Sequence, residues 1–292
     1  MGKNELERLL LMYSGNYCIP SSRTYNENTE KFLSKWSEYA KEEPIFIGEG
    51  GNWQVFRSEL LPDIQKSNLI PQHCILKCPK NGRAQINIEN FKLLKAHGFP
   101  CLDFMKEMQE YKGILICSDL NYDYKNNQYN NNHIYVSPNT SRGRISDNYK
   151  DMELEVLTPI YETLETRGIG YIDNIQKCIQ ENSLYFFNLA KKGICISEDC
   201  LFAGVTASKE KTVNIDLIVA DLDTIAITNT EDKDEYSHYE NFKISMNAML
   251  STLDEFLYRF SYSDKLYREI SGSIIENEYN TMEDKFKKYK AQ

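Results

Sequence analysis

The hydrophobic pattern of the chain changes at Pro44, and this change limits the folds that the chain can adopt. Residues 1–44 carry apolar side chains at helical spacing, which predicts two short helices. Residues 45–120 instead carry short β-type runs around a single helical segment, 86–96. Strands that follow one another closely usually pair antiparallel, so this part is expected to form a small sheet. The predicted strands are 45–47, 54–57, 73–77, 102–105 and 113–117.

The rest of the chain is expected to be mainly helical. An apolar stripe predicts a helix over 174–192, and Gly193 is its expected end. Two strands then form a hairpin around 208–211, and the second strand, 213–220, is the most apolar run of the chain. Helical spacing resumes from Tyr239. The predicted fold class is therefore α+β, with the strands concentrated in the first half.

An asparagine-rich and tyrosine-rich stretch, 121–148, separates these two regions. Its composition predicts a loop or an insertion. A solvated connector explains such a segment, and a docking element for a protein partner is the alternative.

The composition of the 292 residues is that of an ordinary soluble protein. The hydrophobic fraction is 41% and the charged fraction is 26%, which excludes wholesale disorder. The formal charge of −9 argues against a nucleic-acid partner, because surfaces that bind phosphate backbones concentrate Lys and Arg. No run approaches 18 apolar residues, so no membrane span is expected. The eight cysteines form no C-x-x-C pair, which favours reduced thiols and a cytoplasmic location.

The first candidate site is the glycine-rich stretch between the first two predicted strands, which contains Gly48, Gly50 and Gly51. Backbone N–H groups without side chains around them can approach phosphate oxygens closely. The stretch lacks the lysine of a Walker A loop, and no helix follows it as in a dinucleotide-binding fingerprint. A bulged turn without a ligand is the plainer interpretation.

The second candidate is a lysine and glutamate pair. Lys77 ends a predicted strand about two dozen residues after the glycines, so its ammonium could reach the same phosphates. Glu89 is the only acid of the helix 86–96, and it could hold Lys77 in place. A lysine in solvent and a surface glutamate are the alternatives.

The third candidate is the pair of carboxylates that follows the most apolar strand, Asp221 and Asp223. Unpaired carboxylates are costly to bury, and a hard divalent cation such as Mg²⁺ would compensate them. An acidic turn at the surface is the alternative.

In this order, the candidate elements resemble the eukaryotic-like protein kinase superfamily, which includes bacterial antibiotic phosphotransferases. The resemblance extends over about 45–225. Gly48 and Gly50 match the first two glycines of the family's loop, and Val55 matches the valine that follows them. Trp53 stands where the third glycine would be.

The other motifs match in part. Lys77 is similar to the strand lysine, and Glu89 to the helix glutamate. Ser118 and Leu120 lie where the family's connector between lobes contacts adenine through its backbone. The triplet at 221–223 matches D-F-G only in its first residue, Asp221.

The resemblance implies a bilobal kinase-like fold with ATP and Mg²⁺ as cofactors. The N-lobe, a small antiparallel sheet, would comprise 45–120, and the mainly helical C-lobe 121–292, with the insertion at 121–148. Residues 1–44 would be an N-terminal helical extension. The glycines, Lys77, Glu89, Ser118 and Leu120 would bind the nucleotide, while Asp221 and Asp223 would bind the metal.

The catalytic loop departs from the family's H-R-D-x-x-x-x-N pattern and allows two registers. In the first, Asp199 is the family's aspartate, and Gly204 stands where the asparagine would be. In the second, Cys195 and Cys200 take those two positions. The first register is preferred because it keeps a carboxylate that can accept a hydroxyl proton. Neither register supplies the asparagine.

Two functions follow from the resemblance. The leading hypothesis is an atypical kinase that transfers the γ-phosphoryl group of Mg-ATP to a hydroxyl of a protein or a small molecule, with Asp199 and Lys77 in catalysis. The alternative is a pseudokinase, a nucleotide-binding or protein-interaction scaffold with 121–148 as the element that docks its partner. A third interpretation is that the order of the motifs is coincidental and that the fold is not kinase-like.

Overall fold

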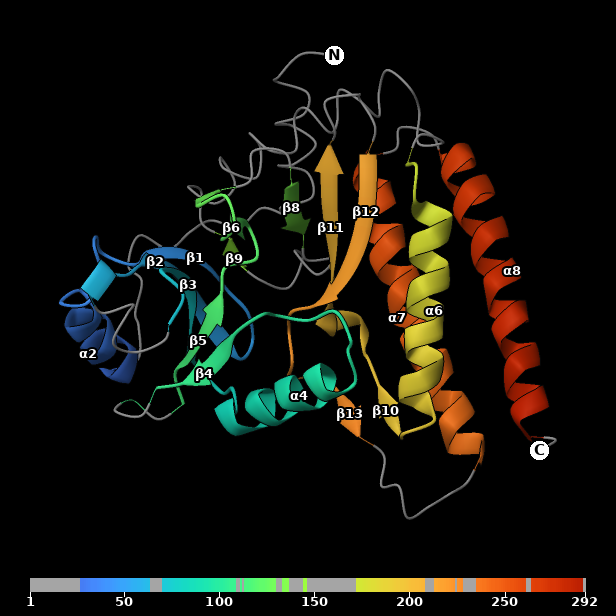
Figure 1. Cartoon of the computed structure of the whole chain (residues 1–292), viewed down its shortest axis with the longest axis horizontal. Coiled ribbons are helices and arrows are strands. Elements are labelled where there is room, and N and C mark those ends of the chain that lie inside the picture. The colour runs from blue at the N-terminus through green and yellow to red at the C-terminus, as the bar shows by residue number, and fades with distance from the viewer. Residues whose placement is uncertain are drawn as a thin grey trace. The chain divides into compact units, whose positions relative to one another are not determined.

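The computed structural model describes residues 27–63, 70–108, 111, 113–129, 133–136, 144–145, 172–207, 213–223, 225–227, 235–260 and 264–290 (Figure 1). The chain divides into two compact units. Unit 1 comprises 1–93, 102–130 and 139–155, and unit 2 comprises 94–101, 131–138 and 156–292. Both units combine helices with strands, so the fold class is α+β. The first expected helix, within residues 1–26, lies outside the described residues.

In the described part of unit 1, six strands form one antiparallel sheet in the order β4-β5-β3-β2-β1-β9. The first three predicted strands are confirmed, with slightly wider bounds. The helix α4, Ala84–Ala96, connects β3 to β4 as the spacing predicts. The strands are β1 Ile45–Glu49, β2 Trp53–Glu59, β3 His73–Pro79, β4 Met105–Glu107, β5 Leu115–Ser118 and β9 Arg144–Ile145.

The fourth strand begins later than predicted, at Met105 instead of residue 102. The reason is local hydrogen bonding. The hydroxyl of Ser118 accepts the backbone N–H groups of Asp103 (3.2 Å) and Phe104 (3.4 Å), which a neighbouring strand would otherwise bind. The ladder with β5 therefore begins at Met105, and Phe104 contributes only its carbonyl oxygen, which accepts the N–H of Ser118 (3.0 Å).

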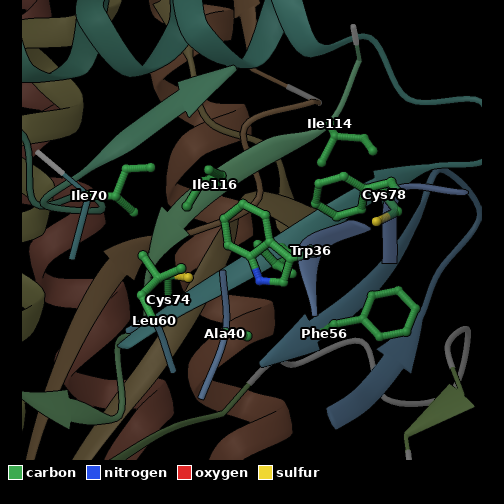
Figure 2. Close-up of a cluster of buried hydrophobic side chains, with 11 residues drawn as sticks. Trp36, Ala40, Phe56, Leu60, Ile70, Cys74, Cys78, Ile114 and Ile116 are labelled. Atoms are coloured by element: carbon green, nitrogen blue, oxygen red, sulfur yellow. The ribbon is translucent and has the colours of Figure 1, made fainter. Parts of the chain in front are cut away.

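Helix α2, Glu27–Trp36, packs its apolar side chains on one face of this sheet. Phe32 is completely buried, and the indole Nε1 of Trp36 donates a hydrogen bond to the hydroxyl of Ser58 on β2 (2.8 Å). Figure 2 shows the side chains of this cluster beside the strands of the sheet. The second expected helix of the N-terminal segment is thus confirmed, and it covers the sheet. The buried members are Phe32, Trp36, Ala40, Phe56, Leu60, Ile70, Cys74, Leu76, Cys78, Ile114 and Ile116.

The described part of unit 2 contains three long helices that contact one another (Figure 1). They are α6, Ile175–Ala190, α7, Glu235–Phe260, and α8, Asp264–Lys290. The helix α6 ends where predicted, because Gly193 adopts a positive φ of 74° that favours glycine.

The strands of unit 2 include the predicted hairpin. The strands β11, Leu201–Ala207, and β12, Val213–Val219, pair antiparallel, and β8, His133–Val136, pairs with the other edge of β11. The short strands β10, Ile194–Cys195, and β13, Ala226–Ile227, pair with each other. Among the described residues, no helix combines the length and apolar character that a membrane span requires.

The asparagine-rich stretch contains more regular structure than the predicted loop. Its described parts include β6, Tyr122–Asp123, paired with β7, Gln128–Tyr129, as well as β8 and β9. The tyrosines explain the difference, because their rings supply apolar area that the asparagines lack. Tyr122 stacks on His73 of β3 with ring centroids 3.7 Å apart.

The packing of α2 generates the first prediction. Phe32→Ala removes a fully buried ring from the cluster and is expected to lower the free energy of unfolding by about 3 to 5 kcal/mol. Chemical denaturation monitored by circular dichroism measures the change. The matched control is Ser34→Ala on the exposed side of the same helix, which should change stability by about 0.5 kcal/mol or less. Equal stability of both variants would show that α2 does not contribute to the core.

Candidate functional site

Lys77 lies on the face of the sheet opposite the α2 cluster. Successive side chains of a strand point to opposite faces, and Cys74, Leu76 and Cys78 point into the cluster. Lys77 and Ile75 therefore share the other face. The strand register places Val55 of β2 directly opposite Lys77, so the predicted valine and lysine are neighbours on this face. The Lys77 side chain is only 8% exposed, which is unusual for a lysine and contradicts the alternative of a lysine in solvent.

The glycine-rich stretch forms the tip of the β1–β2 hairpin. The N–H of Gly50 donates to the carbonyl oxygen of Trp53 (2.9 Å) and closes the turn. A methyl group added at Gly50 or Gly51 would meet no other atom within 4 Å, so the tip is open. Gly48 lies next to a bulge in the pairing with β2. This tip leaves space for a ligand close to the backbone, as a phosphate site requires.

Trp53 stands where the resemblance would place a third glycine. Its side chain is buried, and its ring lies 5.1 Å from the ammonium of Lys77 in a cation–π contact. A methyl group on Gly82 would overlap this ring, so Trp53 and Gly82 are packed against each other. The indole therefore occupies the space beside Lys77.

Glu89 is not brought to Lys77. It is exposed on α4, and its carboxylate accepts a hydrogen bond from the side-chain amide of Gln85 (2.7 Å). Within the described residues no ion pair joins Glu89 to Lys77. The polar residues that α4 buries are Asn87 and Asn90, which are 0% and 3% exposed. Sequence reasoning missed Asn90, although it is the next residue after Glu89.

A buried ion pair holds the segment 118–120 at the end of β5. Nε of Arg57 on β2 donates to Oδ2 of Asp119 at 2.6 Å, and both side chains are almost inaccessible. The Asp119 backbone N–H donates to the hydroxyl of Tyr124 (2.9 Å), and the Asp119 carbonyl accepts the N–H of Tyr122 (3.2 Å). These contacts fix the backbone on both sides of Leu120.

An aromatic cluster surrounds this ion pair. The Arg57 guanidinium lies 4.9 Å from the centre of the Tyr129 ring, and the Tyr124 hydroxyl donates to the carbonyl oxygen of His73. Burial lowers the pKa of His73, and burial raises the pKa values of Tyr124 and Tyr129. His73, Tyr124 and Tyr129 are therefore uncharged at neutral pH, and they surround the Arg57–Asp119 ion pair. We interpret the cluster as a part of the structural core. Its residues were not predicted, since Arg57 and Asp119 are 62 positions apart.

In unit 2, the structure brings Asp199 and Asp221 to the same end of the β11–β12 hairpin. Leu201 pairs with Val219, so Asp199 lies two residues before this pair and Asp221 two residues after it. The N–H of Asp221 donates to the carbonyl oxygen of Cys200 (3.4 Å). Both carboxylates are half-buried. Asp199 lies in the 3₁₀ turn Glu198–Cys200.

The pairing of β11 bears on the two registers of the catalytic loop. Gly204, which the first register places at the asparagine position, lies in the middle of β11 opposite Asp216. It is three pairs, about 10 Å, from the end where Asp221 follows the strand. Cys200 contacts the backbone of Asp221 directly. Cys200, the asparagine position of the second register, therefore lies beside Asp221, while Asp199 of the first register lies at the same end of the hairpin.

The expected metal ligands are Asp221 and Asp223. In the described ranges, no group of three or more His, Cys, Asp or Glu side chains is arranged to hold a metal ion. Asp221 and Asp223 are both half-buried and lie one residue apart after β12. Burial raises the pKa of the Cys195 thiol, so this thiol stays protonated and is a poor metal ligand. Mg²⁺ commonly uses one or two carboxylates together with phosphate oxygens, which the two aspartates could provide with a nucleotide.

Comparisons with known proteins do not assign the chain to a family. No protein-family model matches it, and a search of curated proteins finds no match.

The buried ion pair generates the second prediction. Asp119→Asn leaves the Arg57 guanidinium buried without its counter-charge, which is expected to lower the free energy of unfolding by about 3 to 5 kcal/mol. The double variant Arg57→Met with Asp119→Leu should recover most of this loss, because it removes both charges. Urea denaturation of the wild type, Asp119→Asn and the double variant measures the loss and its recovery. A double variant that is no more stable than Asp119→Asn would contradict the prediction.

Proposed function

We propose that this chain is a kinase-like phosphotransferase that binds Mg-ATP and transfers its γ-phosphoryl group to a hydroxyl group of a protein or a small molecule. The observation that carries the proposal is the placement of Asp199 and Asp221 at one end of the β11–β12 hairpin. Phosphoryl transfer needs a carboxylate for the metal and a group that accepts or orients the attacking hydroxyl, and these two aspartates supply both.

Unit 1 supports the nucleotide part of the proposal. The open glycine tip, Val55 and the buried Lys77 belong to adjacent strands of one sheet. In this proposal, Lys77 binds the α- and β-phosphates, the glycine tip covers them, and the backbone of Ser118 and Leu120 contacts the base. Asn90, one of the two buried asparagines of α4, takes the place of the helix glutamate in this proposal.

Unit 2 supplies the reacting groups in the proposal. Asp221 binds Mg²⁺, which neutralises charge on the phosphates, and Asp223 adds a second carboxylate. Asp199 accepts the proton of the attacking hydroxyl or orients that hydroxyl for in-line attack.

A pseudokinase is the second candidate, and the position of Cys200 favours it. In the second register, the protonated Cys195 and the fully buried Cys200 replace the aspartate and the asparagine of the family. A protein of this kind would bind the nucleotide and interact with a partner without transferring phosphate, and the stretch 121–148 is the proposed docking element.

Turnover of radiolabelled ATP by the purified protein, with and without Mg²⁺, tests the proposal. Asp199→Asn is expected to lower turnover by about 10²- to 10⁴-fold while Mg-ATP binding persists, because only the transfer step needs this carboxylate. Lys77→Met is expected to weaken Mg-ATP binding itself. Calorimetric titration with Mg-ATP separates the two effects.

The matched controls are Lys92→Met on the exposed side of α4 and Asp284→Asn on the exposed side of α8. Neither should alter binding or turnover. A wild-type protein that binds Mg-ATP without turnover would favour the pseudokinase, and one that binds no Mg-ATP would refute both candidates.

A further inference from the structure

The glycine tip is attached to the loop that follows β3. We call the three residues of this loop, Lys80, Asn81 and Gly82, the latch segment. Their backbone N–H groups all donate to the carbonyl oxygen of Asn52, at 2.7, 3.2 and 3.1 Å respectively. The attachment follows from the register, because Trp53 pairs with Pro79, so Asn52 and Lys80 are the next residues on the two strands.

Two side chains of the latch segment contact the tip as well. The ammonium of Lys80 donates to the carbonyl oxygen of Gly50 (3.1 Å) and lies 3.5 Å from a carboxylate oxygen of Glu49. The side-chain amide of Asn81 donates to the carbonyl oxygen of Gly51 (3.5 Å). Three successive carbonyl groups, those of residues 50–52, therefore accept hydrogen bonds from one short segment.

These contacts also orient the backbone N–H groups of Gly51 and Asn52, because the peptide bond is planar. In a trans peptide, the carbonyl of one residue and the N–H of the next point in opposite directions. Fixing the carbonyls of Gly50 and Gly51 toward the latch segment directs the N–H groups of Gly51 and Asn52 away from it. Successive N–H groups with a common direction form a concave anion site.

The indole of Trp53 makes this arrangement rigid. It is 97% buried and is packed on the backbone of Gly82, where a methyl group would overlap it. A side chain at position 82 would therefore displace either the ring or the latch segment. Gly82 lacks a positive φ, so its small size is the property that the packing requires.

We propose that the latch segment holds the glycine tip in a preformed phosphate-binding conformation, with Lys80 and Gly82 as positioning residues. This inference rests on the proposed nucleotide binding and deepens it. A tip that is already ordered loses little conformational entropy when it binds phosphate, which raises the affinity for the nucleotide.

Gly82→Ala tests the proposal, with Lys92→Met on the exposed side of α4 as the control. Hydrogen exchange of the Gly50 amide, measured without nucleotide, reports the order of the tip. Gly82→Ala is expected to accelerate this exchange by at least about tenfold, and to raise the Kd for Mg-ATP and for inorganic tripolyphosphate by about tenfold. Lys92→Met should leave the exchange rate and both Kd values unchanged.

Lys80→Met provides a second variant that retains the backbone of the latch segment. It should accelerate the exchange and weaken tripolyphosphate binding by a smaller factor, and Lys80→Arg should restore much of both. Unchanged exchange in Gly82→Ala and Lys80→Met would overturn the latch, and faster exchange with unchanged tripolyphosphate affinity would overturn its role in positioning.

The two probes separate this proposal from the proposed function. A wild-type protein that binds tripolyphosphate but not Mg-ATP, with the expected effects of the variants, would refute the kinase-like function and support the latch. A wild-type protein that binds neither probe would overturn the preformed phosphate site.

Discussion

The register of strand β3 is the constraint on which unit 1 depends, because side chains on both of its faces are buried. Cys74, Leu76 and Cys78 are completely buried in the cluster with α2. The alternate residue Lys77 is 8% exposed on the other face, beside Trp53. A one-residue slip of β3 would place the ammonium in the apolar cluster and the thiols at the candidate site. The α2 helix therefore stabilises the register that puts Lys77 opposite Val55, although it packs on the other face of the sheet.

Strand register also determines which residues come together in unit 2. Asp199 and Asp221 lie at the end of the β11–β12 hairpin where Leu201 pairs with Val219, and a shift of the pairing would separate them. Two contacts fix this register. The side-chain amide of Asn174 exchanges two hydrogen bonds with the backbone of Ile215, at 2.7 and 2.8 Å. Gly204 leaves room for the carboxylate of Asp216, which accepts a hydrogen bond from the hydroxyl of Tyr135 (3.0 Å).

The sequence predicts the parts of this structure that depend on periodicity. The strands around Lys77, the helix α4, the end of α6 at Gly193 and the β11–β12 hairpin follow from spacing and from glycine alone. The parts that depend on contacts between distant positions are not predictable in this way. The Arg57–Asp119 ion pair and the Trp53–Gly82 packing are of this kind. The buried asparagines of α4, Asn87 and Asn90, were also missed, because polar and apolar residues alternate in 85–89 and do not define which side of the helix is buried.

The position of Cys200 decides what chemistry is left for the carboxylates. A kinase asparagine binds the second metal ion through its amide oxygen, and a thiol with no exposed area next to Asp221 offers no such oxygen ligand. Any metal near Asp221 would therefore rely on Asp223 and on phosphate oxygens. In the proposed function, the first register keeps Asp199 as a carboxylate that accepts a proton, whereas neither register places an amide oxygen beside Asp221. The departure from the family pattern therefore affects the proposed metal site more than the proposed proton acceptor.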